Sequence, residues 1–291
     1  MSINTTGDLA LVGGVDSVVG VYSLSQKTVV QTLKTDGPVT DATWAGDKAV
    51  VGSSTGSVKV FENGAEVASF ASHAGEVTAV TVHATGDIIA SVGVDKSYVL
   101  YDLATNTVVS QIFSDAGKKS LCETHIPERD ANRFYSALLS ASFHPDGHLI
   151  AAGGADGHVK IFDIKTGAAA ADYAMSGPVK CLFFSENGTY LAAVAAQSTT
   201  VSIWDLRSSK ETKVLDTGSQ VESIFWDYTG QFLLTGGPSG VTVQQFSKAS
   251  KGWSEPLRSA VPATSVAWGS AAQSIVALNE AGVVTVLAAQ S

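Results

Sequence analysis

The stretch STTVSIWDL at residues 198–206 shows the pattern on which the rest of the chain is built. Val201 and Ile203 point to one side and Ser202 and Trp204 to the other, because successive side chains of a β-strand alternate between its faces. The phrase recurs as DSVVGVYSL at 16–24, TGSVKVFEN at 55–63, DKSYVLYDL at 95–103, DGHVKIFDI at 156–164, SGVTVQQFS at 239–247 and AGVVTVLAA at 281–289. Such a repeat predicts an array of similar β-units, whose period decides the fold.

The period is read from the aromatic position of the repeat, which holds Tyr22, Phe61, Tyr101, Phe162, Trp204, Gln244 and Leu287. Successive members lie 39, 40, 61, 42, 40 and 43 residues apart, so the chain has seven repeats and one longer interval. A period of about 40–45 residues with four short strands is that of a WD40 propeller blade. We therefore expect an all-β fold, a seven-bladed WD40 β-propeller of four-stranded antiparallel blades.

The strands of each blade are named a to d from the centre outwards. In the second blade they are expected at Val39–Trp44, Lys48–Ser53, Ser57–Glu62 and Glu66–Phe70. Strand a of the last six repeats ends on a large apolar side chain, which we expect in the core between blades. These side chains are Trp44, Val82, Phe143, Phe184, Trp226 and Trp268. The glycines between strands a and b supply the positive φ of hairpin turns. The glycines that end strand b, such as Gly52 and Gly93, also belong to turns, and no helix follows them to bind a phosphate.

The two ends of the chain depart from the regular pattern. The segment LALVGG at 9–14 already has the character of strand b, and the chain ends just after strand c of the seventh blade. We expect most of strand a of blade one and the outer strand of blade seven to be missing or frayed, which would leave an open edge. This favours one WD40 domain over residues 1–291, excised from a longer protein, or an unusual role for residues 1–6.

The long interval contains SDAGKKSLCETHIPERDANRFYS at 114–136, between the outer strand of blade three and the inner strand of blade four. By propeller topology this d–a loop insertion lies on the top face, the face that carries the d–a loops and the b–c turns. It holds the densest group of basic residues, Lys118, Lys119, Arg129 and Arg133. Loops of this length are usually functional or disordered, so the insertion is either a partner contact or a solvated, variable loop.

The composition excludes several classes of protein. Apolar residues make up 45% of the chain and charged residues 15%, which is typical of buried strands and not of a disordered chain. The net charge of −9 argues against a dedicated nucleic-acid binder. No apolar run is long enough to span a membrane, and the N-terminus lacks the pattern of a signal peptide. Two cysteines, Cys122 and Cys181, indicate a reducing compartment, with Cys181 as a small core residue.

One blade contains a set of residues that could suggest a hydrolase. His73, Ser91 and Asp95 lie in blade three, with Tyr101 at the aromatic position. In WD40 blades, His, Ser or Thr, Asp and an aromatic residue at these places form a buried chain of hydrogen bonds that fixes the turns. We therefore interpret the four residues as structural, and the chain has no Gly-x-Ser-x-Gly elbow that would indicate a catalytic serine.

Neither metal chemistry nor another catalytic centre is indicated. His144 and His148 flank an a–b turn, whereas His158 lies in a b–c turn at the opposite face, so they cannot converge with His125 on a zinc ion. No pair of carboxylates is placed for acid–base work on a shared site. We expect no cofactor, and we expect the chain not to be an enzyme.

The segment SGPVKCLFFSENGTYLAAVAAQSTTVSIWDLRSSK at 176–210 closely resembles the fifth blade of the WD40 domain in the pre-mRNA-processing factor nineteen family. FHPDG at 143–147, VHATGD at 82–87 and GGVDSVVGVYSL at 13–24 are similar to that family too. The resemblance covers essentially the whole chain. The chain departs from the family pattern at Gln197 and Ser198, where a paired acid is usual, and in the long insertion.

The resemblance implies a nuclear scaffold of the spliceosome-activating complex, with links to ubiquitination and DNA repair. Members of the family carry an N-terminal U-box, which recruits a ubiquitin-conjugating enzyme, and a coiled coil that forms tetramers. Neither module is present in this chain, so a ligase activity of the whole protein would not belong to these residues. The resemblance further implies spliceosomal proteins and ubiquitination substrates as partners, and a monomeric state for this domain alone.

Three functions are weighed. The leading hypothesis is a protein-interaction platform whose top face docks partners. The candidate residues on that face are Ser54, Glu76, Lys118, Lys119, Arg129, Gln197 and Gln220. The alternatives are a propeller enzyme, which needs polar groups that converge on the central channel, and direct RNA contact through the basic insertion, which a salt titration would reveal.

Overall fold

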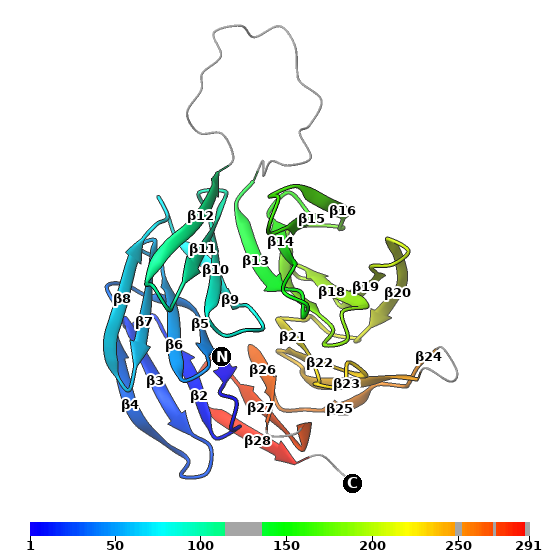
Figure 1. The fold of residues 1–291 in the computed structure, drawn as a ribbon. Coiled ribbons are helices and arrows are strands. Elements are labelled where there is room, and N and C mark those ends of the chain that lie inside the picture. The colour runs from blue at the N-terminus through cyan, green and yellow to red at the C-terminus, as the bar shows by residue number, and fades with distance from the viewer. Residues whose placement is uncertain (114–135, 248–251, 270–271, 289–291) are drawn as a thin grey trace, which may run out of the picture.

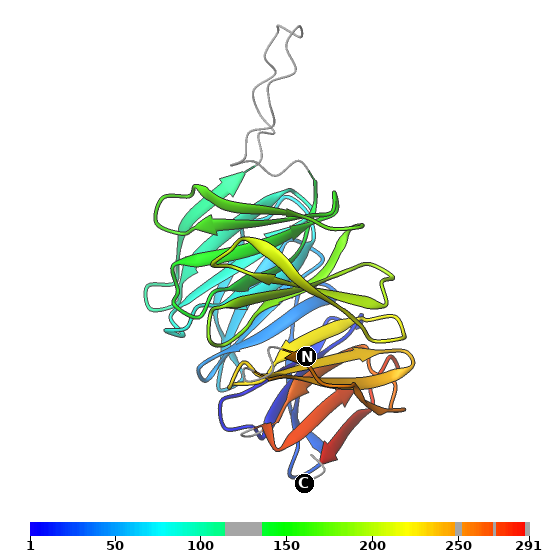
Figure 2. The same cartoon turned by 90° about the vertical axis from the view of Figure 1, so that its right-hand side faces the viewer.

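The computed structural model describes residues 1–113, 136–247, 252–269 and 272–288. These residues form seven antiparallel sheets, which Figure 1 shows arranged around a common centre and Figure 2 shows from the side. The all-β, seven-bladed propeller expected from the repeat is thereby confirmed. Each sheet is one blade, and within blades two to five the strand order a–b–c–d follows the chain.

The first four blades each have four strands. Blade one consists of β1 (Ser2–Ile3), β2 (Leu9–Gly13), β3 (Val18–Ser23) and β4 (Thr28–Lys34). Blade two consists of β5 (Val39–Ala45), β6 (Lys48–Ser53), β7 (Ser57–Glu62) and β8 (Ala65–Ala71). Blade three consists of β9 (Val77–Val82), β10 (Ile88–Gly93), β11 (Ser97–Asp102) and β12 (Thr107–Phe113). Blade four consists of β13 (Leu138–Phe143), β14 (Leu149–Gly154), β15 (His158–Asp163) and β16 (Ala169–Ala174).

The last three blades differ from one another in their outer parts. Blade five is regular, with β17 (Val179–Phe184), β18 (Tyr190–Ala195), β19 (Thr200–Asp205) and β20 (Lys210–Asp216). Blade six consists of β21 (Ser223–Trp226), β22 (Phe232–Gly237), β23 (Gly240–Ser247), β24 (Gly252–Trp253) and β25 (Leu257–Ser259). Blade seven consists of β26 (Ser265–Trp268), β27 (Ser274–Leu278) and β28 (Val284–Ala288).

The core lies between neighbouring blades. The large side chains that end each strand a pack there, as the repeat predicted, and Phe143, Phe184 and Trp226 are each at most 7% exposed. The aromatic position of strand c points toward the preceding blade: Tyr101 of blade three packs on Phe70 of blade two, with ring centroids 4.7 Å apart. Burial of apolar surface between sheets is therefore the main stabilising contribution.

Hydrogen bonds between inner strands join the blades around the centre. A side-chain oxygen of one strand a accepts a backbone N–H from strand a of the next blade. The atom pairs are Asp41 Oδ2 with Val80 N at 2.9 Å, Ser140 Oγ with Leu182 N at 3.2 Å and Ser223 Oγ with Val266 N at 3.1 Å. This contact fixes each blade against the next and satisfies a buried donor.

Blades one and seven meet in the same manner. β1 pairs with β2 over only two residues, and the amino group of Met1 donates a hydrogen bond to Ser265 Oγ at 3.2 Å. Residues 2–3 thus serve as a short strand a, whereas blade seven has three strands among the described residues. As expected, the described residues depart from the regular blade at both ends: strand a of blade one has only two residues, and blade seven lacks a fourth strand among the described residues.

Candidate functional site

The four residues of blade three form a continuous chain of hydrogen bonds. His73 Nε2 lies 2.7 Å from Ser91 Oγ, which lies 2.7 Å from the Tyr101 hydroxyl. On the other side of the ring, His73 Nδ1 donates to Asp95 Oδ1 at 3.0 Å, since a carboxylate can only accept. Ser91 and Tyr101 are completely buried and engage each other, so the serine hydroxyl cannot meet a substrate. The geometry suits a structural role.

The environment of Asp95 favours its ionised form. Burial alone would raise the pKa of Asp95, but hydrogen bonds from His73, the Ala74 N–H and the Ser97 hydroxyl outweigh burial and lower the pKa. Ser97 Oγ lies 2.8 Å from Asp95 Oδ1. The carboxylate thus connects the d–a loop, which carries His73, with the b–c turn that it begins.

Blade two forms a related network from an unexpected residue. Asp36, in the loop before β5, accepts hydrogen bonds from Ser57 Oγ at 2.7 Å and Ser53 Oγ at 3.2 Å. Burial would raise the pKa of Asp36, but the hydroxyl groups of Ser57, Thr55 and Ser53 help to lower it. In this blade the acid stands in the adjacent d–a loop, whereas Thr55 occupies its usual place in the b–c turn.

The top-face residues predicted from the sequence lie apart from one another. Ser54 follows β6, Glu76 precedes β9, Gln197 lies between β18 and β19, and Gln220 precedes β21. These are all places where a strand b ends or a strand a begins, but within the described residues these four side chains make no hydrogen bond to each other. Lys118, Lys119 and Arg129 lie outside the described residues.

Only Gln220 of this group belongs to a polar cluster. Its amide donates a hydrogen bond to Glu222 Oε1 at 2.5 Å, and Glu222 Oε2 forms an ion pair with Lys180 Nζ at 3.0 Å. Gln197 is exposed and adopts a φ of 60°, the left-handed region that non-glycine residues seldom occupy. Ser54, Glu76, Gln197 and Gln220 thus lie at separate blades, and these four side chains do not form one cluster.

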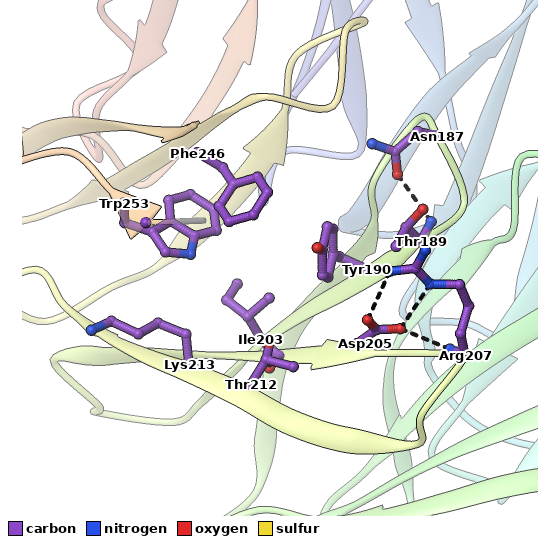
Figure 3. A pocket seen from close by; sticks show the side chains of 11 residues that line it. Asn187, Thr189, Tyr190, Ile203, Asp205, Arg207, Thr212, Lys213, Phe246 and Trp253 are labelled. Atoms are coloured by element: carbon purple, nitrogen blue, oxygen red, sulfur yellow. Dashed lines mark hydrogen bonds and ion pairs between the residues drawn. The ribbon is translucent and has the colours of Figure 1, made fainter. Parts of the chain in front are cut away.

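A hollow of the described surface lies between blades five and six, and we call it the interblade groove. Its volume is about 620 Å³, within the usual range for ligand sites. Its principal lining residues are Tyr190, Ile203, Asp205, Lys213, Phe246 and Trp253. In Figure 3, Trp253 and Phe246 lie on one side, Asp205 and Arg207 on the other, and Tyr190 between them. The groove thus combines an aromatic wall with charged groups.

Beside the groove, blade six departs from the repeat. In blade five, Trp204 fills the aromatic position and stacks on Tyr173 of blade four, with centroids 5.4 Å apart. In blade six this position holds Gln244, which is 6% exposed and whose Oε1 has no hydrogen-bond partner among the described residues. Gln244 fills less space than an aromatic ring, and Trp253 packs against this interface instead.

The outer strand of blade six is divided, and this division places Trp253. β24 pairs with the end of β23, whereas β25 pairs with its beginning. Between them, the Ser254 N–H donates to the Gln245 carbonyl at 2.8 Å, and the Gln245 N–H donates to Ser254 Oγ at 3.0 Å. Trp253 then lies against Phe246, with ring centroids 5.4 Å apart.

The charged groups of the groove are partly paired. Arg207 donates to both oxygens of Asp205, from Nε at 3.2 Å and from Nη2 at 2.9 Å. The hydrogen bond from Arg207 is the main reason that the pKa of Asp205 is lowered. Lys213 is exposed and forms no ion pair with a described residue, so the groove retains a free cationic group.

Two of the histidines considered as metal ligands form hydrogen bonds with nearby residues in the described structure. His144 Nε2 donates to the Gly188 carbonyl of the next blade at 2.9 Å, and His158 Nδ1 lies 2.7 Å from Asp172 Oδ1. No group of three or more metal-binding side chains occurs within the described ranges. His125 falls outside them.

Comparisons with known proteins agree with the fold. A family model described as "Nucleolar protein 10-like, N-terminal domain" matches residues 46–246, which extend from blade two to blade six. The chain belongs to this family of propeller domains. A crystal structure of the mitotic checkpoint complex contains a chain that superposes with a TM-score of 0.82 at 15% identity, covering 100% of this chain and 86% of that one. That likeness shows the fold alone.

Within curated proteins, this Nucleolar protein 10-like propeller is similar to pre-mRNA-processing factor 19. The protein of Oryza sativa is 28% identical over 224 residues, which cover 74% of this chain and 39% of that protein. The protein of Dictyostelium discoideum is 31% identical over 217 residues, which cover 69% and 38%. The resemblance found in the sequence is thus confirmed, and the chain spans about two fifths of the length of these relatives.

The described residues contain no helix of sufficient length and apolar character to cross a membrane. The interblade groove was not predicted from the sequence. Its signals were the glutamine at an aromatic position, Gln244, and two nearby aromatic residues outside the repeat, Phe246 and Trp253. Only the structure shows that Phe246 and Trp253 line a common hollow with Tyr190.

Proposed function

We propose that this propeller is a protein-interaction platform in pre-mRNA splicing and that the interblade groove is its docking site. The names of the curated relatives support the role in splicing. The groove supports docking because it presents half-buried aromatic rings beside exposed charges, a combination that is enriched at protein interfaces. We further propose a nuclear location and association with a ubiquitin ligase complex, in which catalysis resides outside this chain.

The observation that carries the proposal is the aromatic wall. Tyr190 and Phe246 meet edge to face with ring centroids 5.6 Å apart, and Trp253 continues the wall. Tyr190 belongs to blade five, whereas Phe246 and Trp253 belong to blade six, so the wall crosses the boundary between blades. Rigid aromatic side chains give a large contact area at a low cost in conformational entropy.

The proposal is tested by affinity capture from nuclear extract, with the bound proteins identified by mass spectrometry. We expect the wild-type chain to recover proteins of the splicing machinery and Lys213→Glu to lose most of them. The matched control is Lys34→Glu, which makes the same charge change at an exposed position on β4 of blade one. Equal recovery by wild type and Lys213→Glu would contradict docking at the groove.

Two further arms separate the other hypotheses. A variant that combines Glu76→Lys with Gln197→Lys tests the top face. If it failed to recover proteins that Lys213→Glu still recovers, the docking site would lie on the top face and not in the groove. Treatment of the extract with ribonuclease tests RNA contact, since proteins held through RNA would be lost from wild type and variants alike.

A further inference from the structure

We propose that the interblade groove binds an acidic, proline-containing segment of a partner protein in an extended conformation. The inference rests on the proposed docking function and adds the chemistry of the ligand. It follows from three properties of the lining: which hydrogen-bonding groups are free, what charge they carry, and how the aromatic rings are arranged.

The free polar groups of the groove are mainly donors. The Tyr190 hydroxyl, the Trp253 Nε1–H and the Lys213 ammonium group form no hydrogen bond with a described residue. Lys and Trp side chains can only donate. The one carboxylate of the lining, Asp205, already accepts three hydrogen bonds from Arg207, one from its backbone N–H and two from its guanidinium group. A ligand that satisfies this groove must therefore bring acceptors, such as backbone carbonyls and carboxylates.

The charge of the lining agrees with this requirement. Arg207 and Lys213 are cationic and Asp205 is anionic, so the described lining has an excess of one positive charge on a protein of net charge −9. The side chain of Arg207 is 71% exposed, and donors of its guanidinium group remain available beyond Asp205. Complementary charge guides an acidic segment to this place and disfavours a basic one.

The aromatic rings favour proline over a flat or a cationic group. Phe246 is tilted by 51° to Trp253 and by 66° to Tyr190, so neighbouring rings of the wall are not parallel and the wall is ridged. Proline-rich segments in the polyproline II conformation dock on aromatic-lined grooves, with their carbonyls free to accept. A methylated ammonium group would have to enter beside Lys213, which repels it.

Single-stranded RNA fits the same features less well. Its bases require open ring faces for stacking, and its backbone requires a track of cations. Here the rings contact one another and one of the two cations is paired with Asp205. RNA is therefore an outcome that the test must be able to reveal, and not the ligand that the groove favours.

The test selects peptides from a random dodecapeptide phage library on the immobilised wild-type chain, with counter-selection on Trp253→Ala. We expect the enriched sequences to contain proline flanked by Asp or Glu. Enrichment of basic or proline-free sequences, or the absence of any groove-dependent enrichment, would overturn the proposal.

A selected peptide, labelled with fluorescein, is then titrated against variants by fluorescence anisotropy. Because Trp253 also packs on Trp226, two variants that leave the core intact keep the test independent of folding. We expect Tyr190→Phe, which removes one donor, to weaken binding about fivefold, and Lys213→Glu to weaken it about tenfold and abolish its salt dependence. Equal affinities for wild type and both variants would contradict the proposal, as would preferential, groove-dependent binding of oligouridine.

The outcomes separate this inference from the proposed function. If capture from nuclear extract depends on the groove but the selected peptides lack proline and acidic residues, the docking function stands and the ligand chemistry is wrong. If neither capture nor peptide selection depends on the groove, both proposals fail.

Discussion

The indole rings of Trp226 and Trp253 pack with their centroids 5.7 Å apart, although they come from the inner and outer parts of blade six. Trp226 is 1% exposed and belongs to the core between blades five and six. Trp253 is half-buried and lines the interblade groove. The wall of the groove is therefore fixed directly to the core, so that stability and the proposed docking depend on one side chain.

Trp253→Ala is expected to lower the free energy of unfolding by about 1–2 kcal/mol, less than the loss of a fully buried tryptophan. The measurement is urea unfolding followed by fluorescence. The control is Tyr228→Ala, which removes an aromatic ring that is 67% exposed in the a–b turn of the same blade. Equal losses in the two variants would show that Trp253 does not stabilise the interface.

Asp95→Asn is expected to make the free energy of unfolding depend less on pH in the acidic range. The pKa of Asp95 is lower in the folded chain, so unfolding takes up a proton at acidic pH. Its contribution is complete above the unfolded pKa of about 3.9 and is lost as the pH falls through the folded value. At pH 7 we expect the variant to be less stable by about 1–3 kcal/mol, because it breaks a buried hydrogen-bond chain.

The comparison with Asp156→Asn identifies the source of this effect. Asp156 lies at the same turn of blade four, is exposed, and accepts a hydrogen bond from the His158 N–H at 3.2 Å. The free energy of unfolding of both variants is measured in urea between pH 2 and pH 7. For Asp95→Asn, its difference from wild type should shrink toward low pH. If the difference in unfolding free energy between wild type and Asp95→Asn stayed constant with pH, the ionisation of Asp95 would not be coupled to folding.

Asp36 and Thr55 allow a test of whether the acid of the polar network can be supplied from either loop. Asp36→Ala leaves the buried Ser53 and Ser57 hydroxyls without their acid, and we expect a loss of about 1–2 kcal/mol. Thr55→Asp restores an acid at the b–c turn, since Thr55 Oγ1 already lies 2.6 Å from Ser53 Oγ. The variant that combines Asp36→Ala with Thr55→Asp should have a higher melting temperature than Asp36→Ala alone. An equal or lower melting temperature for the combined variant would contradict this.

The fold could be predicted because strand alternation and the spacing of the aromatic position are properties of the chain itself. The expected strands of blade two, such as Lys48–Ser53 and Ser57–Glu62, match β6 and β7. The division of the outer strand in blade six could not be predicted, since β24 and β25 are too short to show a period and depend on their contacts with β23.

The candidate site was harder to predict because it lies where blade six departs from the repeat. The sequence shows a glutamine, Gln244, at the aromatic position, but it does not show what fills the space that an aromatic ring would occupy. The blade-three network of His73 and Asp95 followed from the repeat, whereas Asp36 was missed because its partners Ser53 and Ser57 lie on other strands.

His144 and His148 lie in one turn but should differ sharply in their effect on stability. His144 Nε2 donates to the Gly188 carbonyl at 2.9 Å and its ring meets Phe184 edge to face, with centroids 5.1 Å apart, so it joins blades four and five. His148 is exposed. We expect His144→Ala to cost about 1–3 kcal/mol in urea unfolding, because it opens the interface and leaves a carbonyl unsatisfied. His148→Ala should stay within about 0.5 kcal/mol, and His144→Gln, which keeps a donor, should recover part of the loss. Similar losses for the two alanine variants would show that the turn is held by its backbone and not by the histidine between the blades.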